Sequence, residues 1–500
     1  MLEVFTVDQC KEMDKQSIIN VGIPGIVLME NAALTIFNKI IHKGNSFLLL
    51  CGKGNNGGDA LALARHLILA GKKVSVYIIS SDENFTSDFQ TNFNIVKNLI
   101  HEKDVSFIRS ENDINNQVAR DLENYNVIID GIFGVGLNKD LTGMYKKVIE
   151  YINLYGKFIV AIDVPSGLDC NLGVERRTAV HADVTYTFEV VKKGFLNYKA
   201  IDCIGSLEMV KIGIPEDVKK ANSGKIYILE KEEYKQLLPQ RVVYGHKGSY
   251  GRALIAAGRK GFSGAAFIST ECTVRTGAGL TTLICDEEVQ RVLENRLIEA
   301  MTLSWEDDVI DLIKNADSIA FGPGIGTGNR EEKLLIQVID NSKCPIIIDA
   351  DGITLLGKNK ALLNNLRGRA IITPHPGEMA RFLGITVEEV EADRIRIAKE
   401  VASKYGVIVL LKGYNTVISN GKEVYINPTG NSKMASGGMG DALTGIINGF
   451  LSQGVNIEQA ALLGAYVHGR IGDRLGENYY IVNARDIIKE LPKEINNICS

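Results

Sequence analysis

The chain has 500 residues and a formal net charge of −4, from 56 basic and 60 acidic side chains. This length predicts about two to four domains, and the scattered basic residues exclude the footprint of a nucleic-acid-binding protein. No apolar run approaches the ~18–20 residues that span a bilayer, and the first residues lack a signal-peptide pattern, so no membrane partner is expected. The eight cysteines contain no CxxC pair, which argues against a zinc or redox motif and favours the reducing cytoplasm.

The first half of the chain alternates predicted helices and strands. Helices are expected over residues 7–19 and 26–41, separated by a Gly-Ile-Pro-Gly break at 22–25. Residues 46–50 are typical of a buried strand; a glycine-rich loop follows at 52–59, then a helix at 60–70 and a strand at 74–79. This order is a βαβ unit, so we predict a parallel sheet with helices on its faces.

The glycine-rich loop matches the dinucleotide fingerprint GxGxxG through Gly52, Gly54 and Gly57. The fingerprint also requires an acidic residue about 20 positions later, at the end of the next strand. Asp82 comes about ten positions too late, and the loop carries two asparagines and Asp59, which the fingerprint does not need. We therefore predict a ligand loop, but not the usual nicotinamide-cofactor loop.

Two further strands, at residues 127–130 and 158–163, each end in an aspartate and a glycine-bearing turn. Because ligands bind outside the carboxyl ends of parallel strands, we expect five polar residues to converge there: Asn56, Asp59, Asp130, Asp163 and Ser166. The alternative is that these acids only cap the helices that follow. A cluster of oxygen ligands suits a hard cation, and it leaves magnesium, calcium and a monovalent ion open.

The second half repeats the alternation of strands and helices. A first domain is expected at 1–215, a charged linker at 216–240 and a second domain at 241–500. Strands are predicted at 253–257, 280–284, 318–321, 345–349, 370–373 and 407–411, with a helix that ends near residue 276. No GxxxxGK[ST] sequence is present, which excludes a P-loop NTPase.

Two residues at strand ends have open interpretations. His375 lies between two prolines near Glu378, and it is either a functional residue or a loop histidine fixed by packing. Lys412 follows a buried strand, and it is either a phosphate partner or an ordinary exposed lysine.

The stretch at 431–445 contains three glycines in four positions, followed by an apolar run that predicts a helix from near Asp441 to Phe450. Glycines let the backbone turn its N–H groups inward, and a helix N-terminus binds anions. Asp441 is then either a general base that deprotonates a hydroxyl beside a transferring phosphoryl group, or an N-cap that closes the loop.

These motifs carry a family resemblance. The first half resembles the YjeF N-terminal epimerases in residues 55–59 (NNGGD), 130–137 (DGIFGVGL) and 163–167 (DVPSG). The second half resembles the ribokinase-like NAD(P)H-hydrate dehydratases in residues 246–251 (HKGSYG), 322–326 (GPGIG), 373–378 (TPHPGE), 412–413 and 437–441 (GGMGD). The one departure is Ala60, where glycine is frequent. The resemblance implies a two-domain α/β protein, with an N-terminal Rossmann-like three-layer sandwich and a C-terminal ribokinase-like domain.

The resemblance also implies the reactions and their site residues. The first domain would interconvert the R and S hydrates of NADH and NADPH, and the second would dehydrate the S form with ADP and magnesium, releasing AMP and phosphate. Potassium is expected on Asn56, Asp130 and Ser166, and Asp163 is the expected acid–base. The hydrate would contact Asn55, Asn56, Gly57, Gly58, Asp59, Gly134, Val135, Gly136, Leu137, Asn138, Lys139, Asp140 and Asp163 in the first domain, and Ala265, Gly324, His375 and the base Asp441 in the second. The nucleotide would contact Lys412, Gly413, Tyr414, Asn415, Thr416 and Gly440.

Two other functions fit the same residues. The second domain could be a vitamin or sugar kinase that releases a stable phosphoester, and the first could be a ligand-binding module without activity. A homo-oligomer is expected, although the sequence does not set its size.

Overall fold

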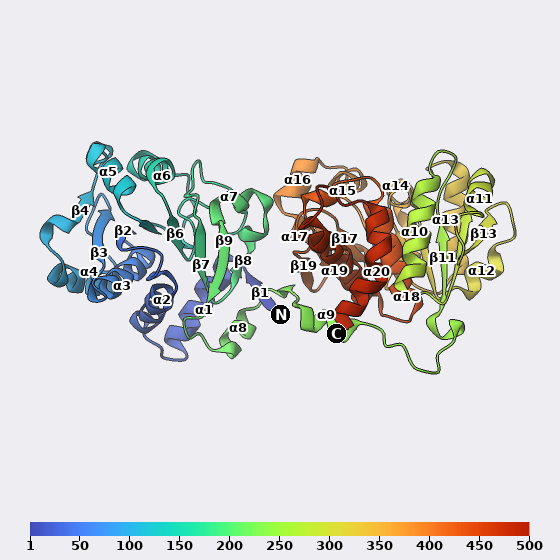
Figure 1. Cartoon of the computed structure of the whole chain (residues 1–500), viewed down its shortest axis with the longest axis horizontal. Coiled ribbons are helices and arrows are strands. Elements are labelled where there is room, and N and C mark those ends of the chain that lie inside the picture. Colours follow the sequence, from blue (N-terminus) through green and yellow to red (C-terminus); the bar gives the residue numbers. More distant parts are fainter. Residues whose placement is uncertain (500) are drawn as a thin grey trace. The chain divides into compact units, whose positions relative to one another are not determined.

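The computed structural model describes residues 1–499, which divide into two compact units on either side of the Gly224–Lys225 bond (Figure 1). The segment 216–240, expected as a linker, is instead folded on both sides of this division. Helix α8 (Glu216–Asn222) belongs to the first unit, and strand β10 (Ile226–Ile228) and helix α9 (Lys231–Leu237) belong to the second.

The first unit contains a parallel sheet of seven strands in the order β4-β3-β2-β5-β6-β7-β9. The predicted strands are present within a residue or two, so the parallel α/β expectation is confirmed. The strands are β2 (Ser46–Gly52), β3 (Lys73–Ile79), β4 (Val105–Ile108), β5 (Val127–Gly131), β6 (Ile159–Ile162), β7 (Val184–Phe188) and β9 (Ser206–Val210). A separate pair, β1 (Leu2–Phe5) with β8 (Val191–Lys192), is also parallel.

Helices cover both faces of this sheet, which explains why its strands are apolar throughout rather than alternating. In β2, Phe47 and Leu49 pack on one side, with α2, α3 and α4, while Leu48 and Leu50 pack on the other, with α5 and α6. The unit is therefore a three-layer sandwich. Its helices are α1 (Val7–Ile19), α2 (Gly25–Ile40), α3 (Asn55–Leu69), α4 (Ser87–Leu99), α5 (Asn116–Asn124), α6 (Gly143–Tyr155), α7 (Ile201–Ile204) and α8.

Helix α3 begins at Asn55, five residues before the predicted start at residue 60. A Cβ on Gly57 would lie 1.8 Å from the Gly52 carbonyl oxygen, so the helix packs directly onto the end of β2. The glycines of the fingerprint-like loop thus permit close packing, while Asp82 forms an exposed ion pair with Lys53 at 2.8 Å. Residues 55–59, predicted as a loop, are the first turns of a helix.

The second unit contains a sheet in the order β13-β12-β11-β14-β15-β16-β17-β18-β19-β10. The strands from β13 to β17 are parallel, and β17-β18-β19 form an antiparallel meander that the sequence did not predict. The strands are β11 (Arg252–Ala256), β12 (Leu280–Cys285), β13 (Met301–Ser304), β14 (Ser318–Phe321), β15 (Ile346–Ile348), β16 (Ala370–Ile372), β17 (Ile408–Leu411), β18 (Thr416–Ser419) and β19 (Val424–Asn427).

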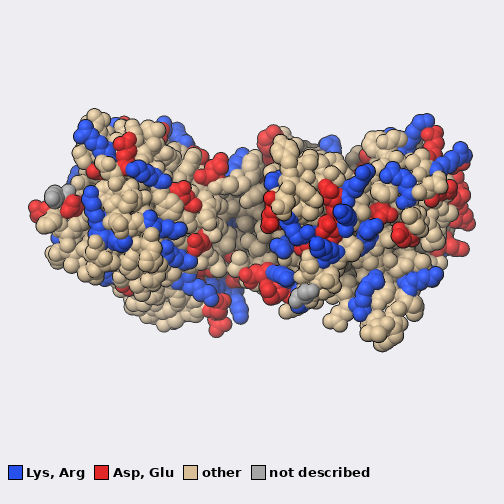
Figure 2. Space-filling model, in the orientation of Figure 1, with Lys and Arg blue, Asp and Glu red and all other residues tan. Residues whose placement is uncertain are grey.

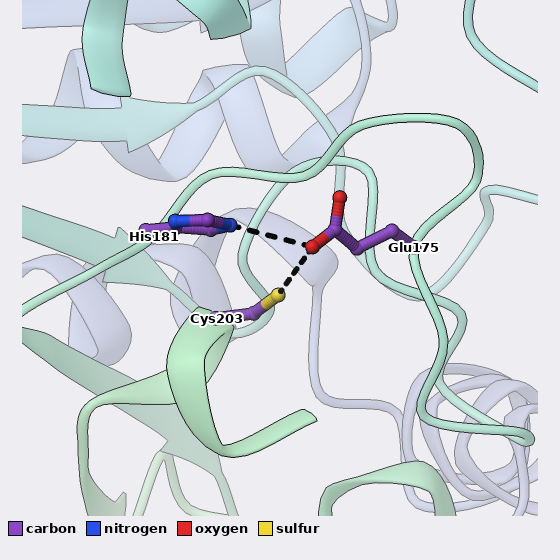
Figure 3. A group of neighbouring side chains, drawn as sticks. All are labelled: Glu175, His181 and Cys203. Atoms are coloured by element: carbon purple, nitrogen blue, oxygen red, sulfur yellow. Dashed lines mark hydrogen bonds and ion pairs between the residues drawn. The ribbon is translucent and has the colours of Figure 1, made fainter. Parts of the chain in front are cut away.

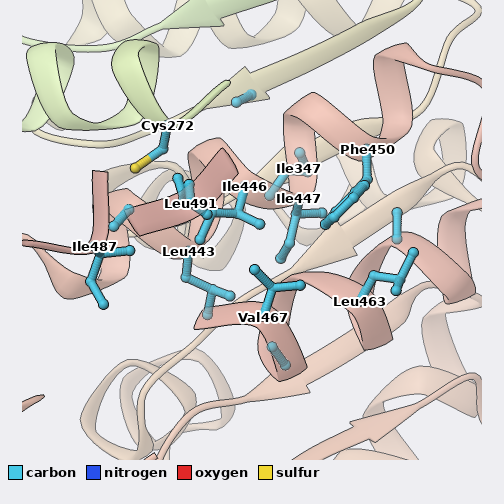
Figure 4. Packing of buried hydrophobic residues seen from close by; sticks show 14 of the residues in the cluster. Cys272, Ile347, Leu443, Ile446, Ile447, Phe450, Leu463, Val467, Ile487 and Leu491 are labelled. Carbon is cyan, nitrogen blue, oxygen red and sulfur yellow. The ribbon is translucent and has the colours of Figure 1, made fainter. Parts of the chain in front are cut away.

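The main core of this unit lies between the sheet and a group of long helices (Figure 4). Leu443, Ile447 and Phe450 on α18 pack in the same cluster as Leu463 on α19 and Leu491 on α20. The helices are α9, α10 (Ser263–Thr276), α11 (Glu287–Leu293), α12 (Ile310–Asn315), α13 (Asn329–Asn341), α14 (Asp351–Lys358), α15 (Pro376–Leu383), α16 (Val387–Ala392), α17 (Arg394–Tyr405), α18 (Met439–Ser452), α19 (Ile457–Gly476) and α20 (Ala484–Cys499).

Helices α10 and α18 approach closely because glycines line their contact. A Cβ on Gly445 would lie 2.3 Å from the Ser269 carbonyl oxygen, and one on Gly449 would lie 2.6 Å from Cβ of Thr276. The residue numbers at the contacts increase in the same direction along both helices, from Ser269 with Gly445 to Thr276 with Gly449, so the helices run parallel. One helical turn before the first of these contacts, the same pairing places Asp441, at the start of α18, opposite Ala265.

We expect Gly445→Ala to destabilise the second unit by about 1–3 kcal/mol, because the added methyl group must push two packed backbones apart. Gly357→Ala is the matched control, since its Cβ would meet only atoms 3.7 Å or more away inside α14. That change should be neutral or slightly stabilising, through helix propensity. Urea unfolding of both variants measures the difference; equal midpoints would contradict the close-packing argument.

Side chains of both charge signs are interspersed over the face of each unit shown in Figure 2, in keeping with the small net charge. Within residues 1–499, no helix is both long and apolar enough to cross a membrane.

Candidate active sites

The strand order of the first unit reverses between β2 and β5, because β3 and β4 lie on one side of β2 and β5 to β9 on the other. In open parallel sheets, such a switch point opens a crevice at the carboxyl ends of the strands. Asn55–Asp59 follow β2, Asp130 lies in β5, and Asp163 and Ser166 follow β6. The sequence prediction that these residues approach one another is consistent with this topology.

Three of these residues form one hydrogen-bonded group. The Ser166 hydroxyl donates to Asp130 Oδ1 at 2.6 Å, and the Ser166 N–H donates to Asp130 Oδ2 at 2.7 Å. The Phe133 N–H donates to Ser166 Oγ at 2.8 Å, and Asn56 Nδ2 donates to the Phe133 carbonyl at 3.0 Å. Asn56, Asp130 and Ser166 are thus brought together around one backbone segment.

The donor set of this group fits a hard cation. Asp130 is fully buried, and burial raises its pKa to about 6 although the Ser166 hydrogen bonds oppose the shift. No ion pair of Asp130 is found within residues 1–499. A buried carboxylate with no lysine or arginine partner, beside amide, hydroxyl and carbonyl oxygens, is an arrangement that a hard cation stabilises.

Asp163 adopts a left-handed backbone conformation, with φ of 62°, immediately after β6. Such strain in a non-glycine residue is often found at functional sites. Its Oδ1 accepts from Lys192 Nζ at 2.6 Å and from the Phe188 N–H at 3.0 Å. Lys192 was not predicted from the sequence, because nothing in a strand of two residues signals an ion pair.

Asp59 is also buried, and burial, followed by the negative charges of Asp163, Asp14 and Asp88, raises its pKa well above the ordinary value. Asp14, on α1, was not predicted as a site residue either, and burial raises its pKa to about 6.

The remaining residues predicted for the first site lie on the loop between β5 and α6. Gly134 approaches the group above, since its Cβ would lie 3.4 Å from Asn56 Cβ. Asp140 pairs with Arg177 Nε at 3.3 Å. The loop is partly buried at Val135 and Leu137 and exposed at Gly136, Asn138, Lys139 and Asp140.

The second unit has its own switch point, between β11 and β14. The turns after these two strands are joined, because the Gly258 N–H donates to the Pro323 carbonyl at 2.9 Å. A Cβ on Gly324 would lie 3.2 Å from Cβ of Ala265. Ala265 and Gly324, both expected from the family resemblance, are thus neighbours at the carboxyl edge of the sheet.

Asp441 is the third residue of α18, whose N-cap is Gly438 with φ of 88°. The alternative that Asp441 is itself the N-cap is therefore wrong. Burial, followed by the charge of Asp349, raises the pKa of Asp441 to about 6, and the Lys412 ammonium partly opposes this shift. The carboxyl group is poised to exchange a proton near neutral pH.

Lys412 is a partner of buried acids and not an ordinary exposed lysine. Its Nζ lies 2.8 Å from Asp349 Oδ1 and 3.9 Å from Glu378 Oε2. Asp349 is 1% exposed, and its Oδ2 accepts from the Thr444 hydroxyl on α18 at 2.8 Å. A Cβ on Gly440 would lie 3.3 Å from Lys412 Nζ, so the cation lies against the start of α18. Asp349 was not predicted, although it ends the expected strand at 345–349 just as Asp130 and Asp163 end theirs, and that shared pattern could have identified it.

His375 is the N-cap of α15, where its Nδ1 accepts from the Gly377 N–H at 3.0 Å. Its Nε2 lies 3.6 Å from Glu378 Oε1, and the side chain is half exposed. The hydrogen bond from the Gly377 N–H therefore fixes the ring in the loop, while the exposed edge of the ring stays open to a ligand. His375 can thus be both a loop histidine held by its surroundings and a residue that contacts a ligand.

The predicted nucleotide segment, Lys412–Thr416, is the turn between antiparallel β17 and β18. Arg394 Nη2 donates to the carbonyls of Leu411 and Lys412, each at 2.9 Å, and Nη1 donates to the Tyr414 carbonyl. Arg394 lies 17 to 20 positions earlier in the chain and was not predicted. It holds the shape of the turn through these carbonyls, and its Nε also forms a long ion pair with Glu391 Oε2 at 4.0 Å.

A cavity of about 480 Å³ lies next to the candidate site of the second unit, beside Ala265 and the start of α18. It lies between the start of α10 and the glycine turn before α18, and Ser263, Gly264, Arg296, Gly437 and Arg485 line it. Its volume is in the range of small-molecule sites.

Comparison with known proteins decides the family. A model of the YjeF-related N-terminal domain matches residues 25–194, and a model described as NAD(P)H-hydrate dehydratase matches residues 253–493. The chain is 33% identical to the bifunctional NAD(P)H-hydrate repair enzyme of Moorella thermoacetica, over 99% of this chain and 97% of the relative. This chain belongs to the family of bifunctional NAD(P)H-hydrate repair enzymes.

Other members of this repair-enzyme family match over most of their length. The Escherichia coli enzyme is 32% identical over 93% of this chain and 88% of its own. Among solved structures, a ribokinase-like superfamily protein from Enterococcus faecalis has 30% identity and a TM-score of 0.51, and it covers 55% of this chain and 96% of its own. The ribokinase-like expectation for the second unit of this repair-family chain is confirmed.

Outside the two sites, residues 1–499 contain one close group of metal-capable side chains: Glu175, His181 and Cys203 (Figure 3). The imidazole Nε2 lies 3.3 Å from Glu175 Oε1, and the Cys203 thiol lies 3.8 Å from the same oxygen. Burial raises the pKa of Cys203 to about 12, so the thiol keeps its proton and donates to the carboxylate. We therefore describe this group as a hydrogen-bonded cluster and assign no metal to it.

Proposed function

We infer that this chain repairs hydrated nicotinamide nucleotides: the first unit interconverts the R and S hydrates of NADH and NADPH, and the second dehydrates the S form. Family membership supports both activities, since the relatives that match nearly the whole chain are named as bifunctional repair enzymes. The observation that carries the chemistry is Asp441, a carboxylate of raised pKa in the first turn of α18, beside the Lys412–Asp349 pair.

We propose that ADP drives the dehydration. Hydroxide leaves poorly, whereas a phosphate ester leaves well. Asp441 takes the proton of the C6 hydroxyl, whose oxygen attacks the terminal phosphorus of ADP and displaces AMP. The free N–H groups of Gly437–Gly440 stabilise the transferring charge, with Lys412 nearby. The ring nitrogen then helps to expel phosphate, and loss of a proton from C5 restores the reduced cofactor.

The ligands are assigned by the same proposal. The nucleotide contacts Lys412, Gly413, Tyr414, Asn415, Thr416 and Gly440, and the hydrate contacts Ala265, Gly324, His375 and Asp441. Magnesium binds the phosphates of the nucleotide, because it is usually held by substrate phosphates together with few protein ligands. That the chain forms a homo-oligomer and works in the cytoplasm stays a prediction.

In the first unit we propose that Asp163 is the acid–base group that helps hydroxide to leave C6 and return on the other face. Residues 55–59 and 134–140 contact the hydrate. Potassium binds at Asn56, Asp130 and Ser166, where it offsets the buried carboxylate of Asp130 and fixes the turn that carries Ser166.

One experiment tests the whole assignment. Purified protein receives a mixture of R and S hydrates with ADP, with ATP or with neither, and chromatography follows both epimers and the recovered cofactor. We expect both hydrates to disappear only with nucleotide, together with release of AMP and phosphate when ADP is supplied. A stable phosphoester would instead support the kinase alternative, and an S form that vanishes while R persists would support a first unit without activity.

The dehydration rate should depend on pH through Asp441. A general base works only when deprotonated, so kcat/KM should be level above pH 7 and fall about tenfold for each unit below the pKa of about 6. Rates on the S hydrate with saturating nucleotide, measured between pH 5 and 8, check this. A flat profile down to pH 5 would contradict the role of Asp441 as the base.

The cation proposal predicts that epimerisation depends on potassium. Replacing potassium by tetramethylammonium, which is too large for the group around Asp130, should lower the epimerisation rate severalfold and leave dehydration of the S form less affected. In the Asp130→Asn variant, the epimerisation rates in potassium and in tetramethylammonium should be equal. Equal epimerisation rates of the unmodified protein in both salts would contradict the potassium site.

A further inference from the structure

Lys192 is a buried lysine that the proposed reactions do not yet use. It is 2% exposed, and its Nζ lies 2.6 Å from Asp163 Oδ1 and 3.0 Å from the Phe188 carbonyl oxygen. Burying a lysine in an ion pair costs several kcal/mol of desolvation, and removing one partner leaves the other charge uncompensated. A pair of this kind beside a proposed catalytic carboxylate calls for a functional explanation.

The hydrogen bonds of Asp163 are arranged asymmetrically. Oδ1 accepts from Lys192 Nζ, from the Phe188 N–H at 3.0 Å and from the Thr187 hydroxyl at 3.4 Å. All of the side-chain hydrogen bonds described for Asp163 end on Oδ1. Its other oxygen is therefore the one left to meet a ligand, in a carboxylate whose orientation is set by three donors.

We propose that Lys192 is a positioning residue of the epimerase: its hydrogen bond to Oδ1 orients the Asp163 carboxyl group and directs Oδ2 toward the hydrate. This inference rests on the proposed role of Asp163. It also specifies that role: as the ring nitrogen expels the C6 hydroxyl, Oδ2 gives it a proton so that it leaves as water, and Oδ2 regains a proton from the water that then adds to the other face of C6.

The surroundings explain why a cation is needed at this position. The titratable groups coupled electrostatically to the pair are Cys10 and Asp14 on α1, Asp59 on α3 and Cys170 after β6. All of them are neutral or negative. Burial disfavours a charged lysine here, but Asp163 and then Cys10 outweigh it and raise the pKa of Lys192. Lys192 is the charged donor among the three described for Asp163 Oδ1, and its loss would leave only the Phe188 N–H and the Thr187 hydroxyl to orient the carboxyl group.

The test compares Lys192→Met with Lys192→Arg. A displacement of about 1 Å in a catalytic group can cost ~10²-fold in rate, so Lys192→Met should lower epimerisation ~10–100-fold. Lys192→Arg keeps a charged donor to Oδ1 and should retain most of the rate. Lys219→Met is the matched control: Lys219 forms a second buried pair in the same unit, 3.1 Å from Glu189, and its loss should leave the epimerisation rate unchanged.

Dehydration of pure S hydrate by the second unit of the same chain calibrates the amount of active protein, and unfolding midpoints report the folding of each variant. If Lys192→Met does not fold, Lys192→Gln replaces it with the same expectation. A Lys192→Met rate at the level of the unmodified protein, or a Lys192→Arg rate no higher than that of Lys192→Met, overturns the inference. An Asp163→Asn variant with full activity would instead overturn the proposed role of Asp163 itself.

Discussion

Asp441→Asn should abolish nucleotide-driven dehydration while the chain keeps its epimerase activity. The amide has the size and hydrogen-bonding groups of the acid, but it cannot accept a proton from the C6 hydroxyl. General-base catalysis contributes about 10²–10⁴-fold, so a loss of this order is expected in the rate at which reduced cofactor is recovered from S hydrate and ADP. Nucleotide binding should persist, since Lys412 and the N–H groups at the start of α18 remain.

The control for this variant is Asp317→Asn. Asp317 accepts the Arg252 N–H at 2.8 Å at the amino ends of the strands, which is the opposite edge of the sheet from the site. It should dehydrate at the normal rate. If Asp441→Asn also recovers cofactor at the normal rate, the phosphorylation scheme fails, because no other described carboxylate occupies the first turn of α18.

Asp163→Asn should have the reciprocal effect. Starting from pure R hydrate, epimerisation above the enzyme-free rate should fall by about 10²–10⁴-fold, because asparagine neither takes nor gives the proton. Dehydration of pure S hydrate should be unchanged. Chromatography of the two epimers over time, with and without ADP, measures both activities in one preparation.

A matched change in the same unit is Asp183→Asn. Asp183 Oδ2 accepts the Ile159 N–H at 2.7 Å at the amino end of β6, away from the carboxyl edge of the sheet. This variant should epimerise normally. Full epimerisation by Asp163→Asn would show that the left-handed conformation of residue 163 has a purely structural cause.

Much of the architecture could be predicted from local patterns. A strand such as β2 has helices on both faces, so it is apolar at every position and is visible in the sequence as a short hydrophobic run. Glycines and acids after such runs indicate the carboxyl ends of strands. This reasoning predicted that Asn56, Asp59, Asp130, Asp163 and Ser166 converge. Three of them, Asn56, Asp130 and Ser166, are joined by hydrogen bonds.

The errors arose where a distant contact decided the local structure. Helix α3 starts at Asn55 because Gly57 packs against the Gly52 carbonyl oxygen, which no propensity within residues 52–60 shows. The antiparallel turn at 412–416 depends on Arg394.

The sequence by itself determined the two α/β halves, the carboxyl edges that carry polar residues, and the family motifs. Only the tertiary structure decided the charge partners: Lys192 for Asp163, and Asp349 for Lys412. The physical reason is that the order of the strands in the sheet brings the two side chains of each ion pair together, although they lie 29 and 63 positions apart in the chain. The local sequence around each partner predicts only the end of a strand, and it carries no information about the residue on the other strand.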